Sequence, residues 1–373
     1  MAKLGDKTFA NSEFLGPISV YVAYLYEQFS VNPLPESIKI PNEYWKPFIQ
    51  LLYKGNNQTE PEYEIDSSLI PNYANIDIDT NKFILAFSGG KDSTANLLYL
   101  MDEDYDVTCV FTKGINRSAT EEIDHAKLVT DSLGAKLVID EISISGKTDY
   151  FENPVKNVLI ISRLLDYGFK NKCAYVSIGE THNLKSEEMD IMYNYSDAID
   201  LLNLFEQAVQ THYPQFRLDW IFKEESTDMS YILYYHPYVL PLLHSCLMPS
   251  RYKKMQLKFS EKYNLHADIR HPDSEGIMNG RCMNCWKCMA EWMYLAVWGL
   301  VPMNQAYLKE KVIPTAAKKI GQLDKSLEGR TDLTVHDVLE ALVEIDTLRE
   351  YVKDPSKIDK DSYHKWPELS KRI

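Results

Sequence analysis

The sequence predicts an α/β fold in which a doubly wound parallel sheet carries helices on both faces. Short apolar segments alternate with amphipathic segments from residue 82 onward, a pattern typical of strands joined by crossover helices. Such crossovers are right-handed, and a sheet wound outward in both directions is covered on both sides. We expect strands at 83–87, 105–112, 135–142, 173–178 and 238–243, with helices at 94–101, 120–133, 155–169 and 197–212.

The helix expected at 120–133 has the clearest signals at its ends. Ser118 or Thr120 can cap its N-terminus, and Glu121 places negative charge in the first turn, where the helix dipole favours it. Gly134 follows the last helical residue, as expected for a C-terminal cap that needs a left-handed backbone.

Three parts are expected along the chain of 373 residues. Residues 1–80 form an N-terminal accessory region, because they are rich in Pro, Tyr and Asn and show no clean period outside the apolar stretch 18–29. Residues 81–303 form the sheet domain. Residues 304–373 form a C-terminal helical extension, in which 334–351 has the apolar spacing of an amphipathic helix.

The composition limits the class of protein and its partners. There are 40 Lys and Arg against 54 Asp and Glu, and the net charge of −14 disfavours unaided binding to nucleic acid or to an anionic membrane. No run approaches the roughly 20 apolar residues of a membrane span, and the N-terminus lacks a signal-peptide pattern. We therefore expect a cytoplasmic protein without a nucleic-acid or membrane partner.

The most informative motif is the glycine-rich turn at residues 88–93, which reads Ser-Gly-Gly-Lys-Asp-Ser. It lies between an apolar strand and a helix, so Gly89 and Gly90 let the backbone approach a ligand and the helix N-terminus attracts an anion. It is not a Walker A loop, which ends in Gly-Lys-Ser/Thr. Lys91 offers a cation, and Ser88 and Ser93 offer hydroxyl donors. Asp92 offers a carboxylate for Mg²⁺.

Three cysteines follow one another at metal-ligand spacing: Cys282, Cys285 and Cys288. Thiolates at this spacing can hold a tetrahedral Zn²⁺, which then needs a fourth ligand. We favour His271, which lies close in sequence, over Cys246, which lies beyond an expected helix. Three buried free cysteines and an iron–sulfur cluster are the alternatives, although no fourth cysteine follows at ferredoxin spacing.

The turn at 88–93 carries the complete signature of the PP-loop ATP pyrophosphatase superfamily, which this chain resembles. Members of that superfamily have an adenine nucleotide alpha-hydrolase-like fold and cleave ATP between the α and β phosphates. The resemblance therefore implies that a substrate oxygen is adenylated and that pyrophosphate is released. It also implies that Lys91, Asp92 and Ser93 act in catalysis.

The turn and the cysteine cluster, in this order, resemble the 7-cyano-7-deazaguanine synthase family, known as QueC, over residues 82–300. Similar segments are 111–118 followed by 122–124, then 153–157, 177–181 and, without the family's following arginine, 195–197. The resemblance implies ATP contacts from Gly114, Asn157 and Gly179, and substrate contacts from Lys156, Glu180, Tyr195 and Asp197. A helix N-cap is an equal alternative for Asp197.

The resemblance to QueC implies the cofactors ATP, Mg²⁺ and a structural Zn²⁺ near residues 271–288. A carboxylate of the 7-carboxy-7-deazaguanine type would be adenylated, and its acyl group would pass to an amine to give an amide or a nitrile. The amine is ammonia in queuosine biosynthesis, and in a QueC-like protein of antiphage defence it would belong to a partner protein encoded nearby. A PP-loop sulfurtransferase or sulfate-reductase-like enzyme and a non-catalytic nucleotide-binding scaffold are the other hypotheses. Monomer and homodimer both stay open.

Overall fold

The chain divides into two compact units, one of residues 1–88 with 96–223 and the other of residues 89–95 with 224–373. The computed structural model describes residues 2–4, 7–9, 12–31, 33–56, 58–71, 77–113, 119–143, 155–179, 199–219, 231–232, 235–243, 262–263, 288–289, 292, 295, 301 and 304–312.

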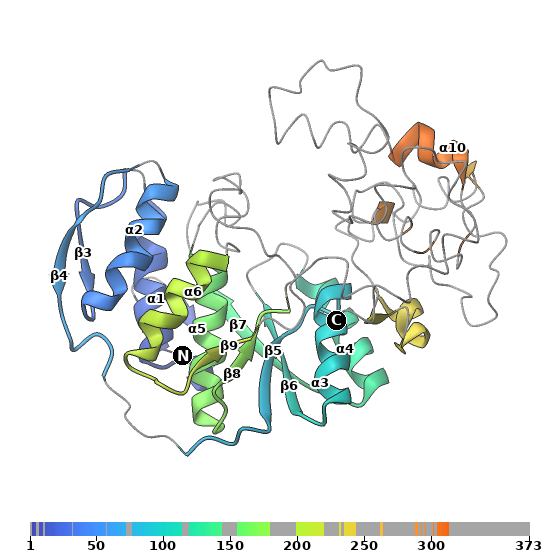
Figure 1. The fold of residues 1–373 in the computed structure, drawn as a ribbon, viewed down its shortest axis with the longest axis horizontal. Helices are drawn as coiled ribbons and strands as arrows, with labels where there is room; N and C mark the ends of the chain where they lie inside the picture. Colours follow the sequence, from blue (N-terminus) through green and yellow to red (C-terminus); the bar gives the residue numbers. More distant parts are fainter. Residues whose placement is uncertain are drawn as a thin grey trace. The chain divides into compact units, whose positions relative to one another are not determined.

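The first unit contains a sheet whose five central strands are parallel (Figure 1). In spatial order they are β7 (Lys136–Ser143), β6 (Asp106–Lys113), β5 (Lys82–Ala86), β8 (Tyr175–Ser177) and β9 (Arg217–Leu218). The chain runs outward from β5 to β7 and then crosses to the other side of β5, so the winding direction reverses between β5 and β8. A hairpin of β1 (Ala2–Leu4) and β2 (Lys7–Phe9) extends the sheet antiparallel to β7. The doubly wound parallel sheet expected from the sequence is confirmed.

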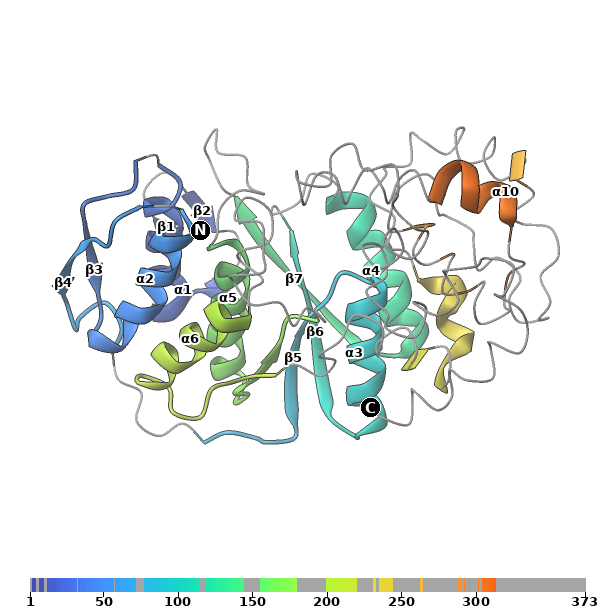
Figure 2. The same ribbon diagram turned by 45° about the horizontal axis from the view of Figure 1, so that its top comes forward.

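Helices connect the parallel strands and cover both faces of the sheet. They are α3 (Lys91–Asp102), α4 (Ala119–Leu133), α5 (Lys156–Lys170) and α6 (Ile199–Gln210). Helix α4 packs on β6 and β7, whereas α5 packs on β5 and β8, and Figures 1 and 2 show these two helices on opposite faces. The expected C-terminal cap of α4 is confirmed, because Gly134 has a φ of 68° and the Ala135 N–H donates to the Thr130 carbonyl at 2.9 Å.

The N-terminal region forms helices and a small second sheet. Its elements are η1 (Ser12–Phe14), α1 (Pro17–Gln28), β3 (Ser37–Ile40), η2 (Glu43–Trp45), α2 (Lys46–Gly55) and β4 (Glu62–Ile65), with β3 and β4 paired in parallel. Ile18, Val22 and Leu25 recur at helical spacing on α1 and are fully buried, and α1 packs against α5. Residues of α1 and α2 share one hydrophobic core with α5 and α6. The expected domain boundaries at 80 and 303 stay predictions.

In the second unit, one sequence expectation is wrong. The strand expected at 238–243 is instead the 3₁₀ helix η5 (Pro237–Leu242). Pro237 and Pro241 lack the N–H that a strand must donate, and Pro237 has the φ of a helical first turn. The chain bonds to itself, since the Val239 N–H donates to the His236 carbonyl at 3.0 Å.

The other described elements of the second unit are α10 (Gln305–Tyr307) and the π-helix η8 (Leu308–Val312). The Tyr307 ring meets the buried Trp292 ring edge-on, with centroids 4.8 Å apart. The helix expected at 334–351 lies outside the described residues. Across the described segments, no helix has both the length and the apolar character needed to cross a membrane.

Candidate functional site

The glycine-rich turn begins at the point where the winding of the sheet reverses. Ser88 comes two residues after the end of β5, and Gly179 comes two residues after the end of β8. These strands are parallel neighbours, so both residues lie at the carboxyl edge of the sheet. Ligands of doubly wound sheets bind at this edge, outside the two strands where the direction reverses. The topology therefore places the turn where a ligand is expected.

The backbone of the turn needs glycine and leads directly into a helix. Gly89 and Gly179 have left-handed φ angles of 76° and 65°, which glycine adopts at little cost. The Gly90 carbonyl accepts hydrogen bonds from the Thr94 N–H at 3.0 Å and the Ser93 hydroxyl at 3.3 Å, so α3 starts immediately after the turn. The N-terminus of an α-helix presents N–H groups and the positive end of the dipole. The turn is thus a backbone cradle suited to phosphate.

Two charged side chains lie at the start of α3. Lys91 Nζ lies 2.5 Å from Asp92 Oδ1, so the two groups form an ion pair. Lys91 is buried, whereas about a third of the Asp92 side chain is exposed, 36%. The ammonium can exchange the carboxylate for a phosphate oxygen. The carboxylate then becomes a hard oxygen ligand of the kind that binds Mg²⁺ together with substrate phosphates.

The first turn of α5 belongs to the same edge of the sheet. Helix α5 leads into β8, which is parallel to β5, so its N-terminus lies at the carboxyl ends of the strands. Lys156 and Asn157 are the first two residues of this helix, and Asn157 is buried. Four of the expected contact positions therefore meet at one edge of the first unit: Ser88, Lys156, Asn157 and Gly179.

Sequence reasoning missed Thr112, which lies one residue before the end of β6. The register pairs Ala86 with Val110, and continuing it by two residues sets Ser88 level with Thr112. Thr112 Oγ1 is buried and has no hydrogen-bond partner. Buried polar atoms are normally hydrogen-bonded, so this hydroxyl suits a ligand at the edge. Its signal in the sequence, a Thr near the end of the second strand, is too common to single out.

Several expected site residues lie outside the described part of the chain. Among the contact positions they are Gly114, Glu180, Tyr195 and Asp197, and among the zinc candidates they are Cys282, Cys285, His271 and Cys246. Cys288 is described, and its side chain is fully buried. No group of three His, Cys, Asp or Glu side chains that could hold a metal occurs among the described residues. The zinc site therefore stays a prediction.

Comparisons with known proteins found a local match in sequence and matches among solved structures. No protein-family model matches the chain. Over 84 residues it is 36% identical to the tRNA-specific 2-thiouridylase MnmA of Treponema denticola, covering 20% of this chain and 23% of that protein. A solved structure of the U34-tRNA thiolase NcsA from Methanococcus maripaludis, with its 4Fe-4S cluster, matches 45% of this chain and 65% of its own, at 17% identity and a TM-score of 0.22.

The chain thus spans about a quarter of the curated relative and less than two thirds of the solved structure. The local sequence match and the complete Ser-Gly-Gly-Lys-Asp-Ser turn support the PP-loop ATP pyrophosphatase superfamily. They do not favour the QueC family over other families in it, so the resemblance to QueC stays a prediction.

Proposed function

We propose that this chain is an ATP pyrophosphatase of the PP-loop type, which binds MgATP at the turn 88–93 and cleaves it to AMP and pyrophosphate. The observation that carries the proposal is the place of this turn, immediately after β5 at the reversal of the sheet. Gly89 opens the backbone for a phosphate, and α3 directs its N-terminus at it. The local sequence match to a tRNA 2-thiouridylase supports the same superfamily.

The residues of the turn have separate tasks in this reaction. Lys91 leaves Asp92 and neutralises the β and γ phosphates, which become the leaving pyrophosphate. The N–H groups of the turn hold the same phosphates in line with the attacking oxygen. Asp92 supplies the carboxylate that would hold Mg²⁺, whose charge lowers the barrier when bound. Thr112 Oγ1, one residue before the end of β6, would donate a hydrogen bond to the nucleotide.

For the second substrate we propose a carboxylate of the 7-carboxy-7-deazaguanine type, on the basis of the resemblance to QueC. A carboxylate oxygen attacks the α-phosphorus, the bond to the β-phosphate oxygen breaks, and pyrophosphate leaves. The resulting acyl adenylate reacts with an amine, which forms an amide and expels AMP. With ammonia as the amine, a second adenylation of the amide leads to the nitrile. With a partner protein as the amine, the acyl group stays on that protein. Lys156, in the first turn of α5, is the described residue proposed to contact this substrate.

Sulfur transfer to tRNA is a second candidate, because the curated relative with the local match is a tRNA thiouridylase. In that reaction the adenylated oxygen belongs to a nucleobase of the tRNA. The net charge of −14 argues against it, since tRNA binding relies on Lys and Arg contacts to phosphates.

The experiment that separates these candidates follows AMP and pyrophosphate release from MgATP with one second substrate at a time. We expect release to depend on 7-carboxy-7-deazaguanine, and we expect tRNA to have no effect. Intact-mass spectrometry with ammonium or with the protein encoded next to this gene then identifies the acceptor. Release that depends on tRNA alone would replace the carboxylate with a nucleobase as the substrate. The formation of ADP would contradict the pyrophosphatase itself.

A further inference from the structure

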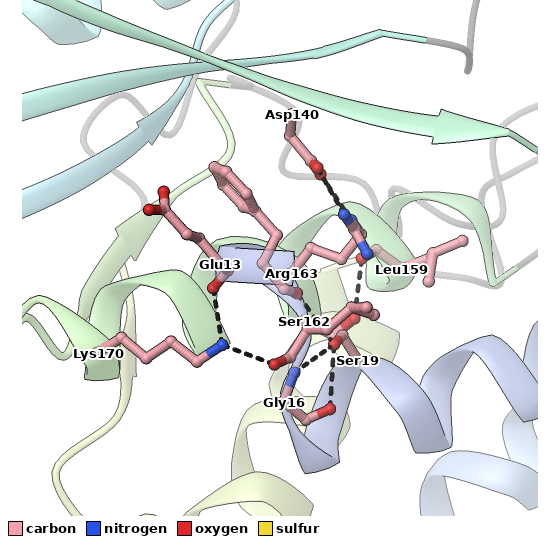
Figure 3. Close-up of polar contacts among 10 residues, drawn as sticks. Glu13, Gly16, Ser19, Asp140, Leu159, Ser162, Arg163 and Lys170 are labelled. Atoms are coloured by element: carbon pink, nitrogen blue, oxygen red, sulfur yellow. Dashed lines mark hydrogen bonds and ion pairs between the residues drawn. The ribbon is translucent and has the colours of Figure 1, made fainter. Parts of the chain in front are cut away.

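A buried ion pair joins β7 to α5 in the first unit. Arg163 of α5 donates two hydrogen bonds to Asp140 of β7, from Nε to Oδ2 at 2.6 Å and from Nη2 to Oδ1 at 2.5 Å (Figure 3). Both side chains are fully buried, with 0% exposed. The parallel fork of the guanidinium against the carboxylate fixes both the distance and the orientation of the two elements.

The pair is connected to the candidate site through both of its elements. Asp140 is the register partner of Thr112, so the two side chains lie on the same face of neighbouring strands. Arg163 lies seven residues beyond Lys156, which puts it about 10 Å along α5 from the first turn of the helix. The pair therefore fixes the position of α5 along the strands of the sheet. It also fixes the first turn of α5, which carries Lys156 and Asn157.

The N-terminal segment 12–19 covers this pair on the side away from the sheet. The Arg163 guanidinium lies 5.8 Å from the centre of the Phe14 ring, which stacks on Tyr167 with centroids 4.4 Å apart. Lys170 Nζ donates to the Glu13 and Leu15 carbonyls at 3.0 and 2.7 Å (Figure 3). Phe14 lies against the guanidinium and the pair is fully buried, so water does not compete for its hydrogen bonds.

A buried ion pair of this kind is a poor way to gain stability. The cost of removing both charges from water offsets most of their attraction, and apolar residues of similar size are often as stabilising. An apolar pair, however, allows a helix to slide or rotate on a sheet, whereas a bidentate fork does not. The pair thus has more effect on the position of α5 than on the stability of the fold.

We propose that Arg163 is a positioning residue, which acts through Asp140 to hold the first turn of α5 at the ATP-binding edge of the sheet. This inference rests on the proposed function, since the turn at 88–93 must bind ATP for that position to matter. Lys156 and Asn157 are the groups whose placement depends on it. Arg163 itself touches neither ATP nor the second substrate.

The test replaces the pair by apolar residues in the double variant Asp140→Leu/Arg163→Met of the full-length chain. We expect a melting temperature equal to or above that of the wild type. We also expect hydrogen–deuterium exchange of peptides covering 155–160 to become about fivefold faster or more. The KM for ATP in pyrophosphate release should rise about tenfold, with kcat changed less than KM.

Two further variants make the outcome decisive. Leu202→Ala removes fully buried side-chain atoms from α6, and it should lower the melting temperature without changing exchange at 155–160 or the KM for ATP. Arg163→Lys keeps the charge without the fork, and it should reproduce the faster exchange and the higher KM if the double variant does not fold.

Wild-type exchange at 155–160 and a wild-type KM in a folded variant of the pair would overturn the inference. A wild-type chain that releases no pyrophosphate would instead refute the proposed function. The exchange measurement would then still decide whether the pair holds α5 in place.

Discussion

Asp166 gives the sharpest prediction about how the N-terminal helix is held on α5. Its carboxylate is buried and accepts a hydrogen bond from the Ser19 N–H of α1 at 2.7 Å. Burial raises the pKa of Asp166 from 3.8 to about 6, although the hydrogen bonds from Ser19 and Gly16 and the charge of Lys170 act in the opposite direction. The folded protein therefore binds this proton more tightly than the unfolded chain does. Consequently the contribution of Asp166 is most favourable below pH 3.8 and becomes less favourable as the pH rises through 6.

The magnitude follows from the two pKa values. The higher pKa of Asp166 in the folded protein lowers the free energy of unfolding by about 3 kcal/mol at pH 8 and by roughly 1–2 kcal/mol at pH 5. The variant Asp166→Asn cannot ionise, so relative to the wild type its free energy of unfolding should rise by roughly 1 kcal/mol between pH 5 and pH 8. Denaturant unfolding of both proteins at the two pH values measures this difference, and any cost of the amide that is independent of pH cancels. A difference that stays constant, or that shifts in favour of the wild type at pH 8, would show that the pKa of Asp166 is not raised in the folded protein.

Three further predictions concern the glycine-rich turn, a buried histidine and the metal. Gly89→Ala should weaken ATP binding about tenfold, because alanine at a φ of 76° strains the turn by about 1–2 kcal/mol. Gly134→Ala, at a φ of 68° with open space around it, should lower stability without affecting ATP binding. ATP titration and thermal unfolding separate the two effects. Burial lowers the pKa of His212, so the contribution of this side chain to stability is present above pH 6.5 and is lost as the pH falls. When unfolding is compared at pH 5 and 7.5, His212→Gln should lack this loss of stability. An equal loss of stability in the variant would assign the effect to other groups. Elemental analysis should find about one Zn²⁺ per chain and none in Cys285→Ala, and iron in its place would contradict the zinc assignment.

Elements with local signals were predicted closely. The strand expected at 83–87 is β5 at Lys82–Ala86, and the helix expected at 120–133 is α4 at Ala119–Leu133. Both follow from a change of hydrophobic period and, for α4, from the glycine after its end. The strand expected at 238–243 was wrong, because the prediction relied on the apolar residues of this segment and gave too little weight to Pro237 and Pro241. The two-residue strand β9 is too short to produce any period.

The contiguous part of the candidate site could be predicted, whereas the contacts made by the fold could not. The turn 88–93 carries its chemistry in six adjacent residues, so its place after a strand was visible in the sequence. Arg163 and Asp140 are 23 residues apart, and only the packing of α5 on the sheet brings them together. Thr112 resembles any strand threonine until its hydroxyl is seen buried without a partner.

In the proposed function, the turn 88–93 binds ATP for cleavage between its α and β phosphates. The most direct measurement incubates the purified chain and its Lys91→Ala variant with Mg²⁺, ATP labelled at the α or the γ phosphate, and the carboxylate substrate. We predict that the α label appears in AMP and the γ label in pyrophosphate. We also predict that the rate in the variant is lower by about 100-fold or more, because a charge that stabilises the transition state is lost. Label in ADP and inorganic phosphate, or an unchanged rate in Lys91→Ala, would contradict it.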